Sequence, residues 1–181
     1  MKYNKKVLIT ELIGSVVIVL LGFIFHEIYE FTGDNFIVGL LAPVNESKWE
    51  HWKIAFLPVL LTSLIEYPYI KDHVNNYIFA KAIGILAFFA TTFGMIELYE
   101  LLIGEGDMWL HIITYIIGAV VSQIVSYYIM TKTKSSKELN QYGIIILIVI
   151  FVIFIVFTIK PPKTDYFRDS TDGTYGIYRE T

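Results

Sequence analysis

The run Gly143-Ile-Ile-Ile-Leu-Ile-Val-Ile-Phe-Val-Ile-Phe-Ile-Val-Phe-Thr-Ile159 contains no ionisable residue, and Lys160-Pro161-Pro162 follows it. A helix needs about 20 apolar residues to cross the hydrocarbon core of a bilayer. Four further segments of this kind precede the run: Val7–Tyr29, Trp52–Ile70, Ile78–Ile103 and Met108–Met130. Because such segments satisfy their backbone groups in lipid as helices, the sequence predicts an all-α, polytopic transmembrane bundle with five spans.

The composition supports this fold class. Hydrophobic residues make up 55% of the 181 residues and charged residues 17%, against about 25% charged in soluble domains. A soluble globular domain and a disordered chain are therefore excluded. The net charge of −3 gives no sign of nucleic-acid binding. The absence of cysteine excludes disulfides, zinc–thiolate sites, iron–sulfur clusters and thiol nucleophiles.

The distribution of lysine predicts the orientation in the membrane. Basic residues gather before the first segment and on the second and fourth connections: Lys2, Lys5, Lys6, Lys71, Lys81, Lys132, Lys134 and Lys137. Since cytoplasmic loops are enriched in Lys and Arg, we expect the N-terminus inside and, after five spans, the C-terminus outside. The first segment is expected to be an uncleaved signal anchor. We expect residues 1–160 to form the transmembrane domain and residues 161–181 to be a loosely ordered, extracytoplasmic polar tail.

Imidazole and carboxylate side chains concentrate at the predicted outer ends of four segments. They are His26 and Glu30 in the first, Glu46, Glu50 and His51 at the start of the second, Glu97 and Glu100 in the third, and His111 in the fourth. Pairs three or four residues apart share a helix face. Burying such groups as ions costs about 2–3 kcal/mol each at mid-depth. Either several of these carboxylates are protonated, or a metal ion holds them. We predict a divalent metal ion, Zn, Mn or Fe, bound by these eight residues.

Other interpretations of the same residues stay open. Ser47 and Glu50 fit a capping box at the start of a helix opened by the stretch from Pro43. His26 or His111, taken singly, can be a hydrogen-bonded interior histidine, and two of the histidines can hold haem. Lys48 and Lys53 are expected to extend their ammonium groups to water.

Four further acidic residues lie apart from this set. Glu11 and Glu66 lie at the other ends of the first two segments. They are expected to pair with Lys5, Lys6 or Lys71, or else to line a proton path. Glu105 and Asp107 are expected to be solvated in a loop.

The run Asn45-Glu46-Ser47-x-Trp49-Glu50-His51, with His26 and Glu30 upstream, resembles a family of small bacterial multi-pass membrane proteins of unknown function. The resemblance implies a bacterial cell membrane and no particular chemistry. The chain is also distantly similar to integral-membrane hydrolases that hold zinc with histidines at helix ends, although their histidine-rich signature is missing here.

These observations predict a metal-dependent membrane hydrolase acting on a lipid, phosphoester or other small-molecule substrate. Glu27 follows His26 in a His-Glu-x-x-Glu pattern and is the candidate general base. The main alternative is a proton- or cation-coupled transporter, since such carriers use carboxylates within the membrane. A third interpretation is a non-catalytic membrane protein whose polar cluster only fixes helix packing. Beyond the bilayer, the sequence predicts no nucleic-acid partner and leaves the oligomeric state open.

Overall fold

The computed structural model describes residues 4–104 and 106–181 and consists of helices joined by short connections. The long helices are α1 (Lys5–Phe31), α3 (Trp52–Ile70), α4 (Tyr77–Leu102), α5 (Met108–Lys132) and α6 (Lys137–Ile159). The described residues also form three short helices: α2 (Phe36–Gly39), η1 (Lys71–His73) and η2 (Asp165–Phe167). Within the described residues, β pairing is limited to isolated bridges in the tail. Lys2 and Glu105 lie outside the described residues.

Each of the five predicted segments is a helix long and apolar enough to cross a membrane. The helical fold class is therefore confirmed, whereas the orientation stays a prediction. The last helix begins at Lys137 rather than Gly143, because the Ser136 hydroxyl accepts a hydrogen bond from the Leu139 amide and caps it. Asn4 and Asp107 cap α1 and α5 in the same way.

The helices pack around an aromatic core. α4 contacts both α5 and α6, and α1 contacts α3 and α5. The core includes Phe56, Phe88, Phe89 and Phe154 from three helices. Gly118 lets α5 approach α4 closely, since a Cβ there would lie 2.0 Å from the Thr92 hydroxyl oxygen. Most large apolar side chains of α6 are exposed, which suits a helix in contact with lipid.

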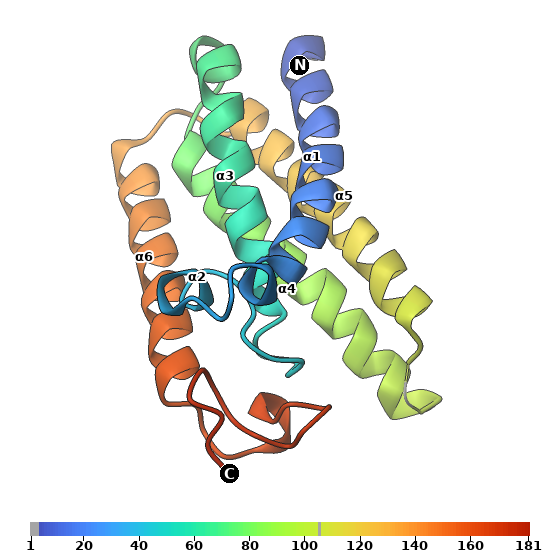
Figure 1. Cartoon of the computed structure of the whole chain (residues 1–181). Coiled ribbons are helices and arrows are strands. Elements are labelled where there is room, and N and C mark those ends of the chain that lie inside the picture. The colour runs from blue at the N-terminus through green and yellow to red at the C-terminus, as the bar shows by residue number, and fades with distance from the viewer. Residues whose placement is uncertain (1–3, 105) are drawn as a thin grey trace.

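The start of α1 and the α3–α4 connection lie at one end of the bundle in Figure 1, and α2 and the C-terminal tail lie at the other. The prediction that the stretch from Pro43 opens a helix is wrong, because residues 43–51 form bends and turns before α3 begins at Trp52. Only half of the capping box forms. The Ser47 hydroxyl accepts from the Glu50 amide, but the Glu50 carboxylate bonds elsewhere.

The expectation that residues 161–181 are loosely ordered is also wrong. The Trp49 amide donates to the Tyr166 carbonyl, and the Trp52 indole N–H donates to the Tyr166 hydroxyl at 2.7 Å. The rings of Phe167 and Trp49 lie 5.0 Å apart between centroids. The tail therefore folds back over the end of the bundle and covers the loop of residues 43–51.

Candidate metal site

Three of the predicted ligands meet at the end of the bundle that carries the tail. His26 comes from the C-terminal part of α1, and Glu46 and His51 come from the loop of residues 43–51. The two Nε2 atoms lie 3.2 Å apart. A Glu46 carboxylate oxygen lies 3.4 Å from Nε2 of His51 and 3.9 Å from Nε2 of His26. We call these three residues the His–Glu cluster.

The hydrogen bonds of both imidazoles determine which ring nitrogen is free. Nδ1 of His26 lies 2.8 Å from a carboxylate oxygen of Glu27, and Nδ1 of His51 lies 2.8 Å from the Ser47 carbonyl oxygen. Because these oxygens only accept, both Nδ1 atoms carry a proton, and a neutral ring then has a lone pair at Nε2. Two lone pairs that face each other repel, so a proton or a cation is needed between them.

The separations suit a metal ion. Zinc binds histidine nitrogen at about 2.0–2.1 Å, which places neighbouring ligand atoms of a tetrahedral site about 3.3 Å apart. Two of the three observed separations are close to this value, and the third is longer. Histidines that bind metals usually donate their other N–H to a carboxylate or a backbone carbonyl, as both rings do here. A tetrahedral ion that is bound by three protein ligands has a fourth position open to water.

A buried ion pair holds the loop that supplies two of these ligands. Glu50 and Lys53 have side chains only 2% exposed and lie 2.6 Å apart. The Glu50 carboxylate also accepts from the Val44 amide and from the hydroxyl of Thr158 on α6. Lys53 donates to the carbonyls of Gly39 and Ala42. The pair thus fixes the loop to both α2 and α6.

Glu46 and His51 shift each other's pKa. The hydrogen bond to His51, together with the two imidazoles, lowers the pKa of Glu46 against the opposing effect of burial. Burial opposes protonation of His51, but Glu46 and the Ser47 carbonyl outweigh it and raise the pKa of His51. Without a metal, the pair therefore favours a carboxylate beside an imidazolium.

The matching family model describes a family of unknown function, DUF6512, and covers residues 1–177. The chain belongs to this family. No curated protein and no solved structure matches it. Membership in DUF6512 thus adds no known activity, and the chemistry of the site has to come from its geometry.

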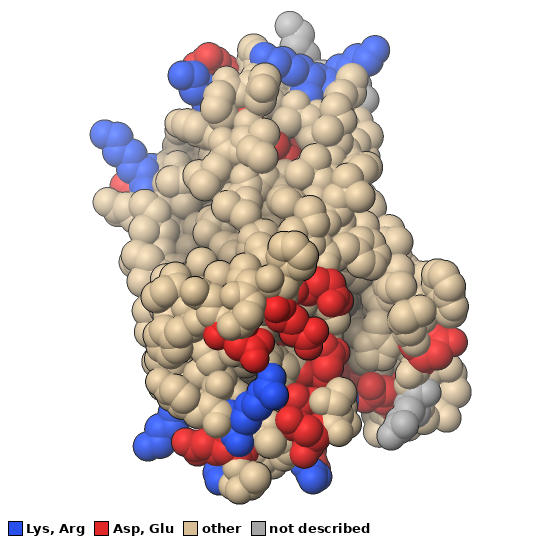
Figure 2. Space-filling view, viewed as in Figure 1, with Lys and Arg blue, Asp and Glu red and all other residues tan. Residues whose placement is uncertain are grey.

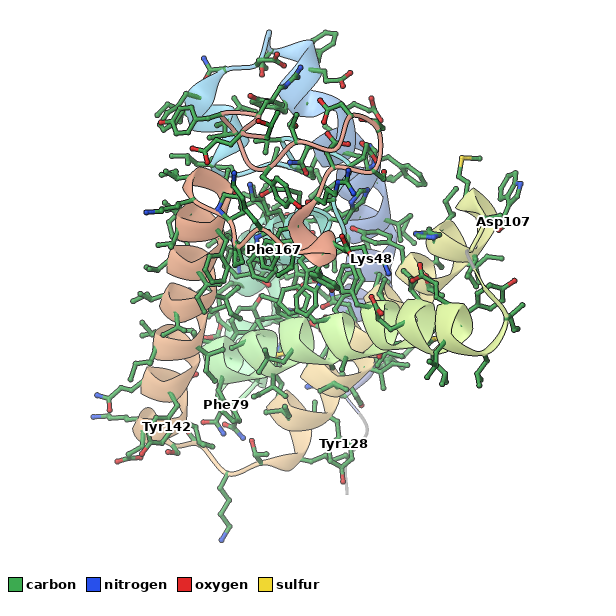
Figure 3. All side chains as sticks on the ribbon, turned by 90° about the horizontal axis from the view of Figure 1, so that it is seen from below. Lys48, Phe79, Asp107, Tyr128, Tyr142 and Phe167 are labelled. Atoms are coloured by element: carbon green, nitrogen blue, oxygen red, sulfur yellow. The ribbon has the colours of Figure 1, made fainter. Side chains whose placement is uncertain are left out.

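The remaining predicted ligands of this DUF6512 member lie outside the His–Glu cluster. Glu97 and Glu100 on α4 both pair with Lys48, at 3.1 Å for Glu97. Glu30 and His111 are exposed near the ends of α1 and α5. Figure 2 shows acidic side chains gathered beside basic ones on the lower part of one face. In Figure 3, Lys48 lies near Phe167 of the tail, whereas Asp107 lies far out at the start of α5.

The structure bears on three expectations about this DUF6512 site. Lys53 does not reach water, since it is buried against Glu50 and two carbonyls. Both Glu50 oxygens are occupied by these local partners, which leaves Glu50 outside the cluster. Glu27 holds the Nδ1 side of His26, on the opposite edge of the ring from Nε2. Glu27 thus fixes the orientation of the His26 ring, and its role as a general base stays a prediction.

Lys53 and Thr158 were not recognised as part of this site from the sequence. The spacing of Glu50 and Lys53, three residues apart, was a local signal for their ion pair. No sequence pattern joins Thr158 to Glu50, because that contact depends on how α6 packs.

Proposed function

We propose that the protein is a membrane metalloenzyme that binds one divalent ion through His26, His51 and Glu46 and uses it for hydrolysis. The observation that carries the proposal is the pair of Nε2 atoms that face each other at 3.2 Å while both Nδ1 atoms donate to acceptors. The donor set of two imidazoles and one carboxylate suits Zn, Mn or Fe.

The open position is what makes such a site suitable for hydrolysis. A metal ion lowers the pKa of a bound water towards neutrality and also polarises a phosphoryl or carbonyl oxygen. Glu46 has a side chain 45% exposed, so the cluster opens toward solvent rather than into the core. Glu27 would keep the His26 ring in the orientation that presents Nε2 to the ion.

The position of His26 supports a lipid headgroup as the substrate class. Phe23 lies one turn earlier on α1, next to Ile24, and both side chains are exposed on the apolar surface of that helix. A lipid whose acyl chains contacted these residues would bring its headgroup near the cluster. We further propose that this reaction occurs at the extracytoplasmic face of a bacterial cell membrane, as the lysine distribution and the family resemblance suggest.

Elemental analysis of the purified protein tests the metal site. The protein is prepared without a histidine tag or a metal column, and we expect about one transition-metal ion per chain. His51→Gln and His26→Gln should each lose it. His73→Gln is the matched control, because His73 is exposed on η1 at the opposite end of the bundle. Metal-free wild-type protein that gains no thermal stability from added Zn or Mn would contradict the proposal.

Hydrolysis is tested separately with the metal-loaded protein. Phospholipid vesicles and a soluble phosphate ester are offered in parallel, and release of headgroup or phosphate is measured. Turnover that needs both the metal and His51 supports the enzyme. A protein that binds metal tightly and hydrolyses neither probe would leave a carrier or a metal-binding protein as the better interpretation.

A second candidate function is a proton- or cation-coupled carrier. One observation favours it: Glu11, Glu66 and Lys81 form a charged group inside the bundle, where a hydrolase at the membrane surface has no need of one. Transport of labelled Zn or Mn into vesicles that contain the protein separates the two functions.

A further inference from the structure

Two carboxylates and one ammonium group are buried together between four helices. Lys81 on α4 lies 2.8 Å from one oxygen of Glu11 on α1 and also pairs with Glu66 on α3. Gln123 on α5 accepts from Lys81 at 3.0 Å and donates to Glu66 at 2.7 Å. All four residues are at most 4% exposed. The sequence-based expectation that Glu11 and Glu66 pair with Lys5, Lys6 or Lys71 is therefore wrong.

This group of Glu11, Glu66, Lys81 and Gln123 lies inside the bundle and apart from the His–Glu cluster. Glu11 and His26 are both on α1, separated by about 22 Å at 1.5 Å per residue. Other polar groups near these charges are neutral. The centre of the Tyr77 ring lies 5.5 Å from the Lys81 ammonium, and Ser126 of α5 lies beside Glu11. Among the described residues, no other ion pair reaches these carboxylates.

The charges of this group do not balance. Two ionised carboxylates and one ammonium leave a net charge of −1 that is shielded from water, which is unfavourable without a compensating positive charge. We propose that the group binds one exchangeable proton, held by Glu11 or Glu66. The bundle then contains a proton-binding site in addition to the metal site, and this inference does not rest on the metal proposal.

The packing favours a proton over a metal ion as the compensating charge. The Lys81 ammonium already occupies the centre of the group, in contact with both carboxylates and with Gln123. Gly14 on α1 packs directly against the group, since a Cβ there would lie 1.9 Å from a Glu66 oxygen and 2.2 Å from the Gln123 nitrogen. A metal ion would have to displace the ammonium, whereas a proton needs no additional space.

Nearby hydroxyl groups provide a means of exchange. Thr62 lies one turn before Glu66 on α3, and Ser122 and Ser126 flank Gln123 on α5. The hydroxyls of these three residues are buried and have no hydrogen-bond partner within the part of the chain that the structure describes. Buried polar groups of this kind are usually satisfied by internal water. Water bound to these hydroxyls would carry protons to and from the carboxylates.

Infrared spectroscopy of the full-length protein in lipid tests the inference. A protonated carboxyl group gives a carbonyl stretching band that shifts in D₂O and disappears reversibly when the pH is raised. We expect this band in the wild type and its loss in Glu66→Gln and Glu11→Gln, since each substitution leaves one carboxylate to balance Lys81. Glu138→Gln is the control, because Glu138 is exposed at the start of α6, and it should keep the band.

The wild-type spectrum decides the question even if a variant fails to fold. A wild-type protein without the band would overturn the inference, as would a band that persists in both folded glutamine variants. A melting temperature that instead rises steeply with Na⁺ or K⁺, in protein that lacks the band, would show that a cation balances the charge and would likewise overturn it. The inference also predicts that Lys81→Met lowers the melting temperature. The double variant Lys81→Met/Glu11→Gln should recover part of that loss.

Discussion

Replacement of Lys53 by methionine tests the buried ion pair that holds the loop of the proposed metal site. Methionine keeps most of the side-chain volume but removes the ammonium that pairs with Glu50 and donates to the carbonyls of Gly39 and Ala42. Removing one partner of a buried ion pair leaves the other charge uncompensated and costs about 3–5 kcal/mol. Because both side chains are only 2% exposed, we expect Lys53→Met to lower the free energy of unfolding by about this amount.

Lys48→Met is the matched control in the same loop. Lys48 also pairs with two glutamates, but its side chain is 40% exposed, and exposed ion pairs contribute about 0–1 kcal/mol. Denaturant titration in detergent micelles, followed by tryptophan fluorescence, gives both values. The double variant Lys53→Met/Glu50→Gln should recover part of the loss, because it leaves no unpaired charge. Equal losses for the two lysine variants, or no recovery in the double variant, would refute the assignment of a buried pair.

Three further predictions address the metal site, the tail and the orientation. In metal-free protein, the pKa of His51 is raised, in spite of burial, by its ion pair with Glu46. The pair therefore stabilises the fold fully below about pH 6.5, the ordinary pKa of histidine. This stabilisation is lost as the pH rises through the pKa of His51 in the folded protein. The melting-temperature difference between wild type and His51→Gln should therefore shrink with rising pH without metal. With Zn the difference should grow, because metal binding adds about 2.7 kcal/mol to the free energy of unfolding of the wild type when the free metal is 100 times its Kd. A melting-temperature difference that depends on neither pH nor Zn would contradict this. Tyr166→Phe removes the hydroxyl that accepts from the indole of Trp52 and should lower the free energy of unfolding by about 1 kcal/mol; no measurable loss in the same titration would mean that the tail is not docked there. In intact cells, a membrane-impermeant thiol reagent should label Asp172→Cys but not Ser135→Cys, and the reverse labelling would invert the orientation.

The helices could be predicted from the sequence because the signal for them is local. A continuous apolar run determines a membrane span whatever its neighbours are, and four of the five predicted segments agree closely with the helices observed. The errors occur where long-range contacts determine local structure. The tail is polar and short, and its order depends on Trp49 and Trp52, which lie more than a hundred positions earlier.

The candidate site shows the same division between local and long-range information. Glu46 and Glu50 are indistinguishable by spacing or by residue type, and both were predicted to bind metal. They differ in their partners, since Glu50 meets Lys53 and Thr158 in the interior, whereas Glu46 stays near the surface beside His51. The convergence of His26 with His51 was predictable from the helix ends they occupy. The tautomers that make the pair suitable for a metal depend on Glu27 and the Ser47 carbonyl, and only the folded loop brings that carbonyl to the ring.

The charge balance at this end of the bundle bears on how many metal ions the site can hold. Eight predicted ligands would be enough for two ions, a number that suits phosphoester hydrolysis. Lys53 neutralises Glu50, however, and Lys48 lies between Glu97 and Glu100. A second ion would have to displace an ammonium group that is already paired. For the proposed metal site, this charge balance favours one ion over two. The proposed hydrolysis would then have to proceed without a second ion to stabilise the leaving group.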